Sequence, residues 1–515
     1  MARPRIPDKK KLADALRALH RITGHDLGVI KGPQISAAHR TLLIEKGWLQ
    51  EILKGWYFVS DPNAAPGDTT PFFANYWEYL GRYLSERFGA GGYCLSAEHS
   101  LLRLAAHNVI PKQVNVLLNR KMTQVQPLAH DYQLIMYPGG TAYPDQAETV
   151  EIAGVRCMAA AYCLVHLSPR FFADYRNEVQ IVMNALQDPA EIARLWSKNA
   201  TGVGRLVGAY RNVGRSDMAD GILAQLANLK LRVVETNPFV GMPVYQLGTP
   251  GKSPLYARIK LMWQQHRESV AQYAPQQRAE TGSPAIYAES VERIKQYDAY
   301  HSLSIERYRV TPELIARVER DDWDPLGNPQ DTQQVAAMAA RGYLDAFTLV
   351  KDVAVRVYSG DVASELTRTQ HQTWFQALFG PSVVDGILTP EQLVGYRRHM
   401  VFLRGSLHSP PHYDYLRDGM SAWMECLSEE PDPFVQAVLG HWMFGFIHPY
   451  MDGNGRMARF IMNILLAGGK YPWTVIKVEL RDEYMQALEA ASVHEDPEPF
   501  ARFIAKQIEG SWDGP

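Results

Sequence analysis

A polar loop between two apolar segments constrains the fold of this chain more than any other feature. The segment Pro433–Ile447 is mostly apolar, and Asp432 can cap a helix at its start. A second apolar helical face includes Phe460–Leu465. The loop His448–Arg459, with the sequence HPYMDGNGRMAR, joins them. The chain is therefore expected to fold around two buried helices that hold this loop between them.

The middle of the loop has the residues of a phosphate site. Gly453 and Gly455 flank Asn454 and let backbone amides approach an oxyanion without hindrance from side chains. The following helix directs its N-terminal dipole at the same place. Arg456 and Arg459 are three residues apart on that helix and face the same way, so they offer two forked donors to a polyphosphate.

The residues before the glycines add a carboxylate and a base. Asp452 directly precedes the nest, where a Mg²⁺ ion that takes few protein ligands needs a carboxylate. His448 is the titratable group of the loop that is suited to accept a proton at neutral pH. Together these groups predict transfer of a phosphorus-containing group from a nucleotide to a hydroxyl. The simpler alternative is a solvated surface loop beside a capped helix.

The loop resembles the signature of the Fic family, HPFx(D/E)GNGRxxR, with Tyr450 in place of the Phe. The segments Gly395–Leu427 and Arg481–Ala491 resemble neighbouring parts of the same fold, so the similarity covers about residues 283–508. The resemblance implies a mainly α protein with an all-α Fic domain. It also implies an adenylyltransferase that moves AMP from ATP to a Ser, Thr or Tyr hydroxyl of a protein and releases pyrophosphate.

The resemblance assigns a role to each loop residue. His448 would be the general base on the target hydroxyl, and Asp452 would hold Mg²⁺. The ATP phosphates would be bound by the residues that follow, with the last of them on the γ-phosphate: Gly453, Asn454, Gly455, Arg456 and Arg459.

A second implied element is a β-hairpin, the flap, which holds a target side chain in extended form by strand addition. It would span Arg404–Pro411, with the docking residues Arg404, Gly405, Ser406, Leu407 and His408. His408 and His412 have the spacing of a helical metal pair, but the two prolines between them forbid a helix, so a zinc site is excluded.

Upstream, Ser302 and Glu306 have the SxxxE spacing of the inhibitory motif (S/T)xxxE(G/N), which precedes the core in some Fic proteins. The resemblance implies that Glu306 pairs with Arg459 and blocks the γ-phosphate. Arg307 stands where Gly or Asn is expected. The alternative is a chance match on an ordinary helix end.

The first sixty residues are basic, with eleven Lys and Arg against five acids. Two helical segments and a hairpin that turns at Leu53–Gly55 give the order of a winged helix-turn-helix. The hairpin sequence GWLQEILKGWYFV resembles that of AbiEi-type antitoxins. Residues 1–60 are therefore expected to contact duplex DNA, and a purely structural interaction module is the alternative.

The middle of the chain reads as an α+β domain over residues 71–239, after a linker at Asp61–Thr70. Strands are expected at Gln113–Leu118 and Tyr132–Tyr137. The glycines of TGVGRLVG follow a helix, so they are expected to form a loop or to pack helices, and not to bind a dinucleotide. A looser stretch follows at about residues 237–283, and then Ser283 caps the helical Fic region, residues 283–508.

The composition sets wider limits. A chain of 515 residues is expected to be multidomain, and its formal charge of −2 gives no overall polybasic character. The 4 cysteines have no CxxC pair and are expected to be buried, reduced thiols. No uncharged run reaches ~18 residues, so we expect no membrane span and a cytoplasmic protein.

Alternatives to protein AMP transfer remain open at this level. One is a Fic enzyme that uses another nucleotide donor, or that removes AMP with Glu306 orienting water. Another is a DNA-binding transcription regulator of toxin–antitoxin type, in which the Fic domain senses nucleotide. The expected partner is an unidentified target protein or the chain itself.

Overall fold

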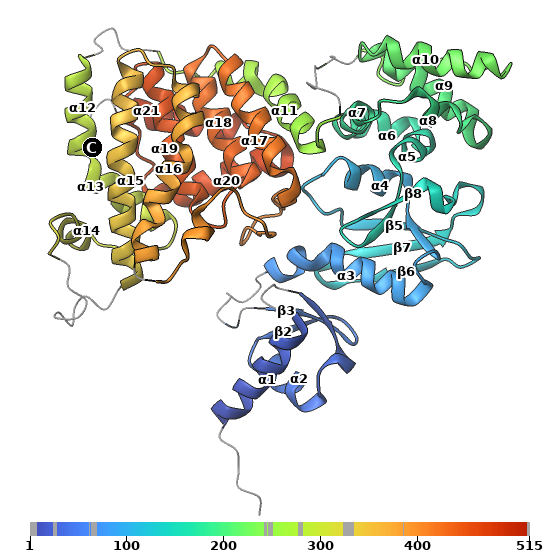
Figure 1. The fold of residues 1–515 in the computed structure, drawn as a ribbon, viewed down its shortest axis with the longest axis horizontal. Helices are drawn as coiled ribbons and strands as arrows, with labels where there is room; N and C mark the ends of the chain where they lie inside the picture. Colours follow the sequence, from blue (N-terminus) through green and yellow to red (C-terminus); the bar gives the residue numbers. More distant parts are fainter. Residues whose placement is uncertain are drawn as a thin grey trace, which may run out of the picture. The chain divides into compact units, whose positions relative to one another are not determined.

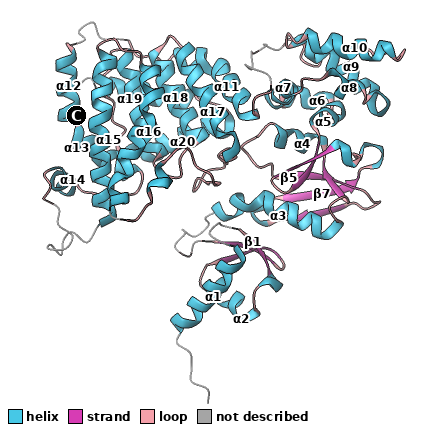
Figure 2. Cartoon of the chain, in the orientation of Figure 1, coloured by secondary structure: helices cyan, strands magenta, loops and turns pink. Residues whose placement is uncertain are grey.

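The chain is mainly helical, as expected. The computed structural model describes residues 8–23, 28–60, 62, 69–241, 245, 251–276, 282–322, 334–384 and 386–511. Helices take 63% and strands 8% of the structure (Figure 2), which confirms the mainly α class. The contacts group the chain into two units (Figure 1): Met1–Pro254 with Val401–Ser409, and Leu255–Met400 with Pro410–Pro515. The predicted linker at 61–70 lies largely outside the described residues.

The first unit begins with the predicted order of helix, helix and hairpin. Its elements are α1 (Asp8–Thr23), β1 (Val29–Lys31), α2 (Ala37–Glu45), β2 (Leu49–Leu53) and β3 (Trp56–Val59). The strands form an antiparallel sheet in the order β1-β3-β2. Ser36 caps α2 by accepting a hydrogen bond from the backbone N of His39 at 3.3 Å.

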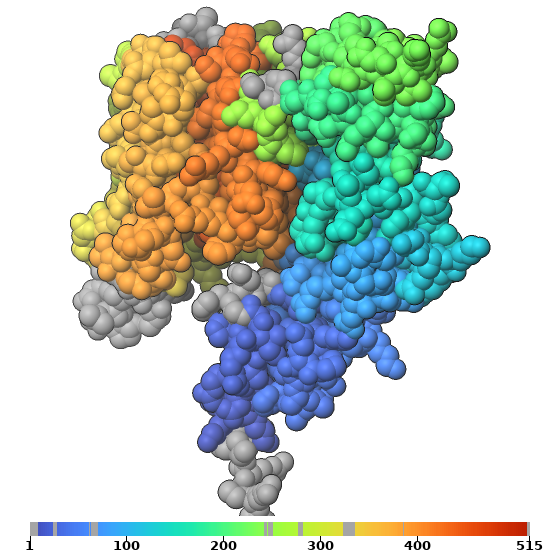
Figure 3. All heavy atoms as spheres, turned by 45° about the vertical axis from the view of Figure 1, so that its right-hand side comes forward, coloured from blue at the N-terminus to red at the C-terminus, as the bar shows by residue number. Residues whose placement is uncertain are grey.

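The hairpin also packs against the next helix, α3 (Thr70–Phe88). Trp56 and Phe58 of β3 meet Tyr79 of α3 edge to face, with ring centroids 5.6 and 6.2 Å apart. Figure 3 shows the dark blue N-terminal segment in contact with the lighter blue segment that follows it. Removing residues 1–60 would therefore expose part of a core that α3 needs.

The rest of the first unit is the expected mixture of helices and strands. Its strands are β4 (Tyr93–Leu95), β5 (Gln113–Leu118), β6 (Gln124–Pro127), β7 (Gln133–Pro138), β8 (Thr149–Ile152) and β9 (Val155–Met158). Its helices are α4 (Ala97–Leu104), α5 (Ala160–His166), α6 (Pro169–Asp174), α7 (Arg176–Ala185), α8 (Pro189–Ala193), α9 (Trp196–Asn212) and α10 (Ser216–Asn228). The larger sheet has the order β4-β5-β7-β6, with β5 and β7 parallel.

Two predictions for this region are confirmed. The expected strands at 113–118 and 132–137 are β5 and β7. The glycines of TGVGRLVG lie within α9, where a Cβ at Gly204 would be 2.1 Å from the carbonyl oxygen of Val234. Gly204 and Gly208 let the non-helical segment 233–237 approach α9 closely, and the glycines form no nucleotide-binding turn.

The second unit is built around α18 (Pro433–Ile447) and α19 (Asn454–Gly468). The surrounding helices are α11 (Pro254–Ala271), α12 (Pro284–Arg293), α13 (Lys295–Ile305), α14 (Pro312–Glu319), α15 (Gln334–Tyr358), α16 (Ala363–Val384), α17 (Leu416–Glu429), α20 (Arg481–His494) and α21 (Glu498–Ser511). Ser283 caps α12 as predicted, accepting from the backbone N of Ile286 at 3.4 Å.

Helix α11 lies inside the stretch that the sequence indicates as loose, so that expectation is wrong there. The helix has polar residues on its buried faces, which hides its amphipathic pattern. Arg258 and Lys260 are buried because they pair with Glu495 and Glu429. The core of the second unit consequently starts at Leu255, before the predicted boundary at 283.

Two further expectations concern thiols and membranes. All four cysteines are buried and unpaired by disulfides, and burial raises the pKa of each thiol. Of the helices in the described ranges, none is both long and apolar enough to cross a membrane.

Candidate active site

The loop His448–Arg459 joins α18 to α19, as predicted. Asp432 caps α18 by accepting from the backbone N of Phe434 and Val435 at 2.8 and 3.2 Å. His448 ends the helix in the left-handed conformation, with φ 51°, and this turn directs the chain into the loop. The first turn of α19 then leaves backbone N–H groups without helical partners, which is the basis of an anion site.

The His448 side chain is arranged as a neutral base. Its Nδ1 lies 3.2 Å from the carbonyl oxygen of Gly445, so a proton on Nδ1 would leave Nε2 as a free acceptor. Burial lowers the pKa of His448 to about 4, the Gly445 carbonyl opposes this, and the charge of Arg397 adds to the lowering. The imidazole is therefore uncharged at neutral pH and can accept a proton.

The two glycines of the nest are required by space. Gly453 has φ 78°, and a Cβ there would be 2.8 Å from the Phe379 ring. A Cβ on Gly455 would be 2.2 Å from Oε1 of Glu306. The carboxylate of Glu306 thus lies directly against the backbone of the predicted phosphate nest.

Asn454 differs from its neighbours because its side chain serves the loop. Its Oδ1 accepts from the backbone N of Tyr450 at 3.0 Å, and its Nδ2 donates to the Tyr450 carbonyl at 2.8 Å. Asn454 is 2% exposed. The backbone of Asn454, and not its side chain, is therefore available for the predicted phosphate binding. The side-chain amide fixes the shape of the loop.

Arg459 is bound by both residues of the predicted inhibitory motif. Its Nε donates to Ser302 Oγ at 2.9 Å, and its Nη2 donates to the Ser302 carbonyl at 3.0 Å and to Glu306 Oε1 at 2.8 Å. Burial would raise the pKa of Glu306, but the charge and hydrogen bond of Arg459 hold it below its ordinary value. The predicted pairing of Glu306 with Arg459 is confirmed.

Arg456 is held between two rings that the sequence reasoning did not single out. Its guanidinium carbon lies 5.2 Å from the Tyr308 ring centroid and 5.0 Å from that of Phe379. Its Nη2 is 3.6 Å from Oδ2 of Asp452. Tyr308 lies two residues after Glu306, and this closeness in the sequence could have indicated that Tyr308 belongs to the site.

Each of the two arginines has one buried N–H donor that is not used within the described residues. Within the described part of the chain, Nη1 of Arg459 and Nε of Arg456 have no hydrogen-bond partner, although both atoms are buried. A buried donor without an acceptor is costly, so such donors point to a missing anion. Phosphate groups of a nucleotide fit this requirement.

Asp452 is the candidate metal carboxylate. Its Oδ1 accepts from the backbone N of Gly453 at 2.6 Å, and its side chain is 66% exposed. The described residues contain no cluster of three or more His, Cys, Asp or Glu side chains suited to a metal. A single carboxylate fits Mg²⁺, which is usually held by one or two carboxylates, substrate phosphates and water.

The flap segment has a turn but no paired strands. The backbone N of Ser406 donates to the Leu403 carbonyl at 3.2 Å, and Gly405 between them has φ 78°. Residues 398–412 contain no β-strand, and Pro410 and Pro411 have no N–H to donate to a strand ladder. The predicted hairpin is therefore a loop with a tight turn in this structure.

The predicted docking residue His408 is already in use within the first unit. It is 3% exposed, and its Nδ1 lies 2.9 Å from Nδ2 of Asn108. The backbone N of Ser409 also donates to the Asn108 carbonyl at 2.9 Å. The C-terminal end of the segment Val401–Ser409 is therefore hydrogen-bonded to Asn108, in the loop after α4.

Tyr450 is the departure from the family pattern, and its ring fills the expected packing position. It stacks on Phe375 with centroids 3.8 Å apart and an interplanar angle of 4°. Its buried hydroxyl has no hydrogen-bond partner among the described residues. The Tyr450 ring therefore packs at the position where the family signature has Phe.

Arg307, the second departure, takes the backbone conformation that explains the family preference for Gly or Asn. Helix α13 ends in a Schellman motif, in which Tyr308 N donates to the Leu303 carbonyl and Arg307 N to the Ser304 carbonyl, at 3.1 and 3.0 Å. Arg307 has φ 67°, a left-handed value that strains a residue with a Cβ. The position favours glycine, but the motif forms with arginine despite the strain.

We expect Arg307→Gly to stabilise the second unit by about 0.5–1 kcal/mol, because glycine removes this strain at a modest cost in unfolded-chain entropy. Thermal unfolding followed by calorimetry measures the change. Arg307→Ala keeps the Cβ and should give no such gain. Equal unfolding temperatures for the Gly and Ala variants would contradict the explanation.

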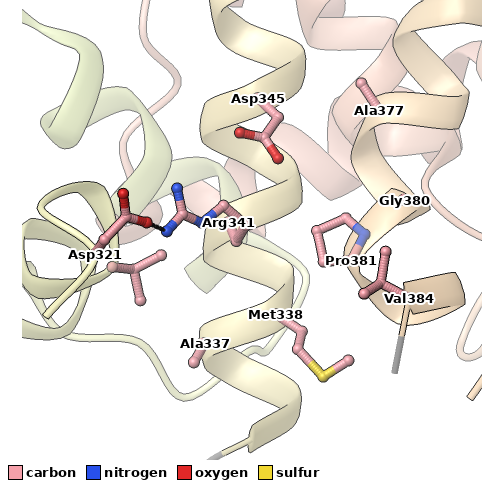
Figure 4. A pocket seen from close by; sticks show the side chains of 10 residues that line it. Asp321, Ala337, Met338, Arg341, Asp345, Ala377, Gly380, Pro381 and Val384 are labelled. Atoms are coloured by element: carbon pink, nitrogen blue, oxygen red, sulfur yellow. Dashed lines mark hydrogen bonds and ion pairs between the residues drawn. The ribbon is translucent and has the colours of Figure 1, made fainter. Parts of the chain in front are cut away.

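A separate hollow of about 570 Å³ lies between α14, α15 and α16 (Figure 4). Arg341 on its wall pairs with Asp321, and burial raises the pKa of Asp345 nearby. The lining comes from Val318, Asp321, Ala337, Met338, Arg341, Asp345, Ala377, Gly380, Pro381 and Val384. No residue of His448–Arg459 is among them, so this hollow is distinct from the phosphate nest.

Comparison with known proteins agrees with the geometry of the loop. Residues 363–466 match the model of the Fic/DOC family. The chain is 38% identical over 134 residues to Protein adenylyltransferase Fic of Nematostella vectensis, covering 25% of this chain and 31% of that protein. It is 32% identical over 107 residues to Protein adenylyltransferase fic-1 of Caenorhabditis elegans, covering 20% and 21%.

A solved structure of Fic-1 from C. elegans aligns with 66% of this chain and 94% of its own, at 17% identity and a TM-score of 0.35. The sequence matches span less than a third of the length of the two relatives. The family match, residues 363–466, includes α18, the loop and most of α19, so this part of the chain is similar to a Fic domain.

Proposed function

We propose that this protein is an adenylyltransferase that transfers AMP from ATP to a Ser, Thr or Tyr hydroxyl of a target protein or of itself. The observation that carries the proposal is the nest before α19, with two buried arginines that each keep an unused donor and a neutral histidine at its start. The relatives named protein adenylyltransferase support the choice of reaction.

The residues of the loop would divide the reaction among them. Nε2 of His448 would take the proton from the target hydroxyl as its oxygen forms a bond to the α-phosphorus of ATP. The bond from that phosphorus to the leaving oxygen breaks, and pyrophosphate departs. Backbone N–H groups at Gly453–Gly455 and the guanidinium groups of Arg456 and Arg459 would stabilise the phosphate charge. Asp452 would hold Mg²⁺, whose charge offsets that of the phosphates.

Glu306 would keep this activity low. Its carboxylate occupies the position beside Gly455 and the Arg459 fork that an anionic phosphate would use. A carboxylate there removes a phosphate ligand and repels ATP. The basal enzyme would therefore be autoinhibited, and release of Glu306 would activate it.

Transfer of label from α-labelled ATP to protein is the direct test. The Glu306→Gly protein is the form to use, because the basal form is expected to be nearly silent. Covalent AMP found by mass spectrometry on a Ser, Thr or Tyr supports the proposal. ATP binding without any covalent AMP would instead favour a nucleotide-sensing module.

A second candidate function, DNA contact by the N-terminal module, is favoured by one feature of its surface. A hollow of about 830 Å³ lies between α1 and α2, lined by Asp14, Leu16, Arg17, His20, Arg21 and His39. Basic side chains of two helices thus converge on one place, as a DNA phosphate contact requires. Arg40 is different, since its Nη1 donates to the Gly32 carbonyl at 2.7 Å and serves the fold.

We expect the double variant Arg17→Gln with Arg21→Gln to weaken binding to a duplex DNA, and to lower the slope of log affinity against log salt by about 2, since each lost phosphate contact lowers it by about 1. Fluorescence anisotropy at several salt concentrations gives the slope. Arg170→Gln, an exposed arginine of α6, is the matched control. An unchanged slope would remove DNA from the proposed partners.

A further inference from the structure

Arg397 is a buried cation that the reaction outlined above does not use. It is 5% exposed, and burial lowers its pKa to about 10. Among the described residues no carboxylate pairs with it. Burying a guanidinium without a counter-ion costs free energy unless its N–H donors are hydrogen-bonded. The hydrogen bonds of Arg397 must therefore offset this cost.

All its contacts are backbone carbonyl groups of two segments. The guanidinium Nε donates to the His448 carbonyl at 2.8 Å, and the backbone N of Arg397 donates to the Pro449 carbonyl at 2.8 Å. Its Nη1 donates to the His399 carbonyl at 2.9 Å and its Nη2 to the Pro411 carbonyl at 2.5 Å. One side chain therefore joins the backbone of the base to both ends of the flap segment.

We propose that Arg397 is a positioning residue that fixes the two ends of the flap, at His399 and Pro411, relative to the backbone of His448, and that this anchoring is needed for transfer to a protein hydroxyl. The flap segment has no strand ladder of its own within residues 398–412. His448 lies in a left-handed turn, where its carbonyl has no helical partner. A planar fork with donors on three sides can hold three carbonyls in one plane, which an ammonium group on a flexible stem cannot do.

The inference rests on the proposed AMP transfer, but it predicts a specific partition of products. Water can replace the protein hydroxyl as the acceptor at His448, which yields free AMP and needs no flap. Loss of the Arg397 fork should therefore lower transfer to protein more than transfer to water. A general loss of folding or of the base would lower both together.

The test uses Arg397→Lys in the Glu306→Gly protein, with α-labelled ATP as probe. Arg258→Lys is the control, since Arg258 is also buried in the same unit and pairs with Glu495, which is not a loop residue. We expect label on protein to fall by about 10²-fold, the share of free AMP to rise, and ATP affinity from calorimetry to stay unchanged. A parallel fall of both products, or no change, would overturn the inference.

Hydrogen exchange supplies a readout that needs no activity. In Arg397→Lys, the hydrogen-bonded amides of Ser406, His448 and Tyr450 should exchange faster together, while Arg258→Lys leaves them protected. Wild-type protection of Ser406, or of His448 and Tyr450, in Arg397→Lys would also overturn the inference. If the Glu306→Gly protein forms no AMP but exchange responds as expected, the proposed function fails and the positioning role of Arg397 stands.

Discussion

Replacing His448 by Ala should lower AMP transfer by about 10²–10⁴-fold, the range expected when a general base is lost. The phosphate ligands are backbone amides and arginines outside this side chain, so ATP affinity should stay close to that of the parent protein. The comparison is best made in the Glu306→Gly background, where the signal is large. Label on protein and ATP affinity from calorimetry give the two numbers.

His494→Ala is the matched control, because His494 is an exposed histidine at the end of α20. It should transfer label like its parent. Transfer by His448→Ala within about tenfold of the parent would show that the proton leaves by another route, and the mechanism would be wrong.

Replacing Glu306 by Gly should raise AMP transfer by about 10–100-fold. A charge-assisted hydrogen bond to a buried partner contributes about 1.5–3 kcal/mol, and each 1.4 kcal/mol corresponds to a factor of ten in rate. Ser302 still holds Nε and Nη2 of Arg459 after the substitution, so the guanidinium stays oriented for the γ-phosphate. Initial rates of label incorporation measure the gain.

Three variants separate the causes of that gain. Glu306→Gln keeps the size and removes the charge, so it should give only part of the activation. Glu306→Gly combined with Arg459→Ala should lose the gain, because the freed fork is absent. Glu289→Gly places a glycine on an exposed position of α12 and should leave the rate unchanged. Activation that survives Arg459→Ala would refute the inhibitory pairing.

The loop and its flanking helices could be predicted because local sequence rules suffice there. Asp432 caps an apolar run, and Gly453 and Gly455 permit a nest that any longer side chain would fill. The Glu306–Arg459 pair was also expected, because Ser302 and Glu306 resemble the inhibitory motif of some Fic proteins, in which the Glu pairs with this arginine.

Other contacts depend on folding that a single sequence does not reveal. Tyr308 and Phe379 enclose Arg456 from two distant segments, and no periodicity connects them. Helix α11 was missed because its buried positions carry Arg258 and Lys260, whose acidic partners lie about 170 to 240 residues further along the chain. The flap was expected to be a β-hairpin and is a loop, because Pro410 and Pro411 oppose strand pairing more strongly than the resemblance suggests.

The division of the chain has a consequence for how the protein is made. Val401–Ser409 belongs with the first unit, yet it emerges from the ribosome roughly 150 residues after Pro254. At typical synthesis rates this is a delay of about 7–30 s. During that interval Asn108 lacks His408 and Ser409, so the nascent first unit waits for a peptide that arrives only with most of the second unit. Synthesis must therefore continue to Ser409, well beyond Pro254, before the first unit is complete.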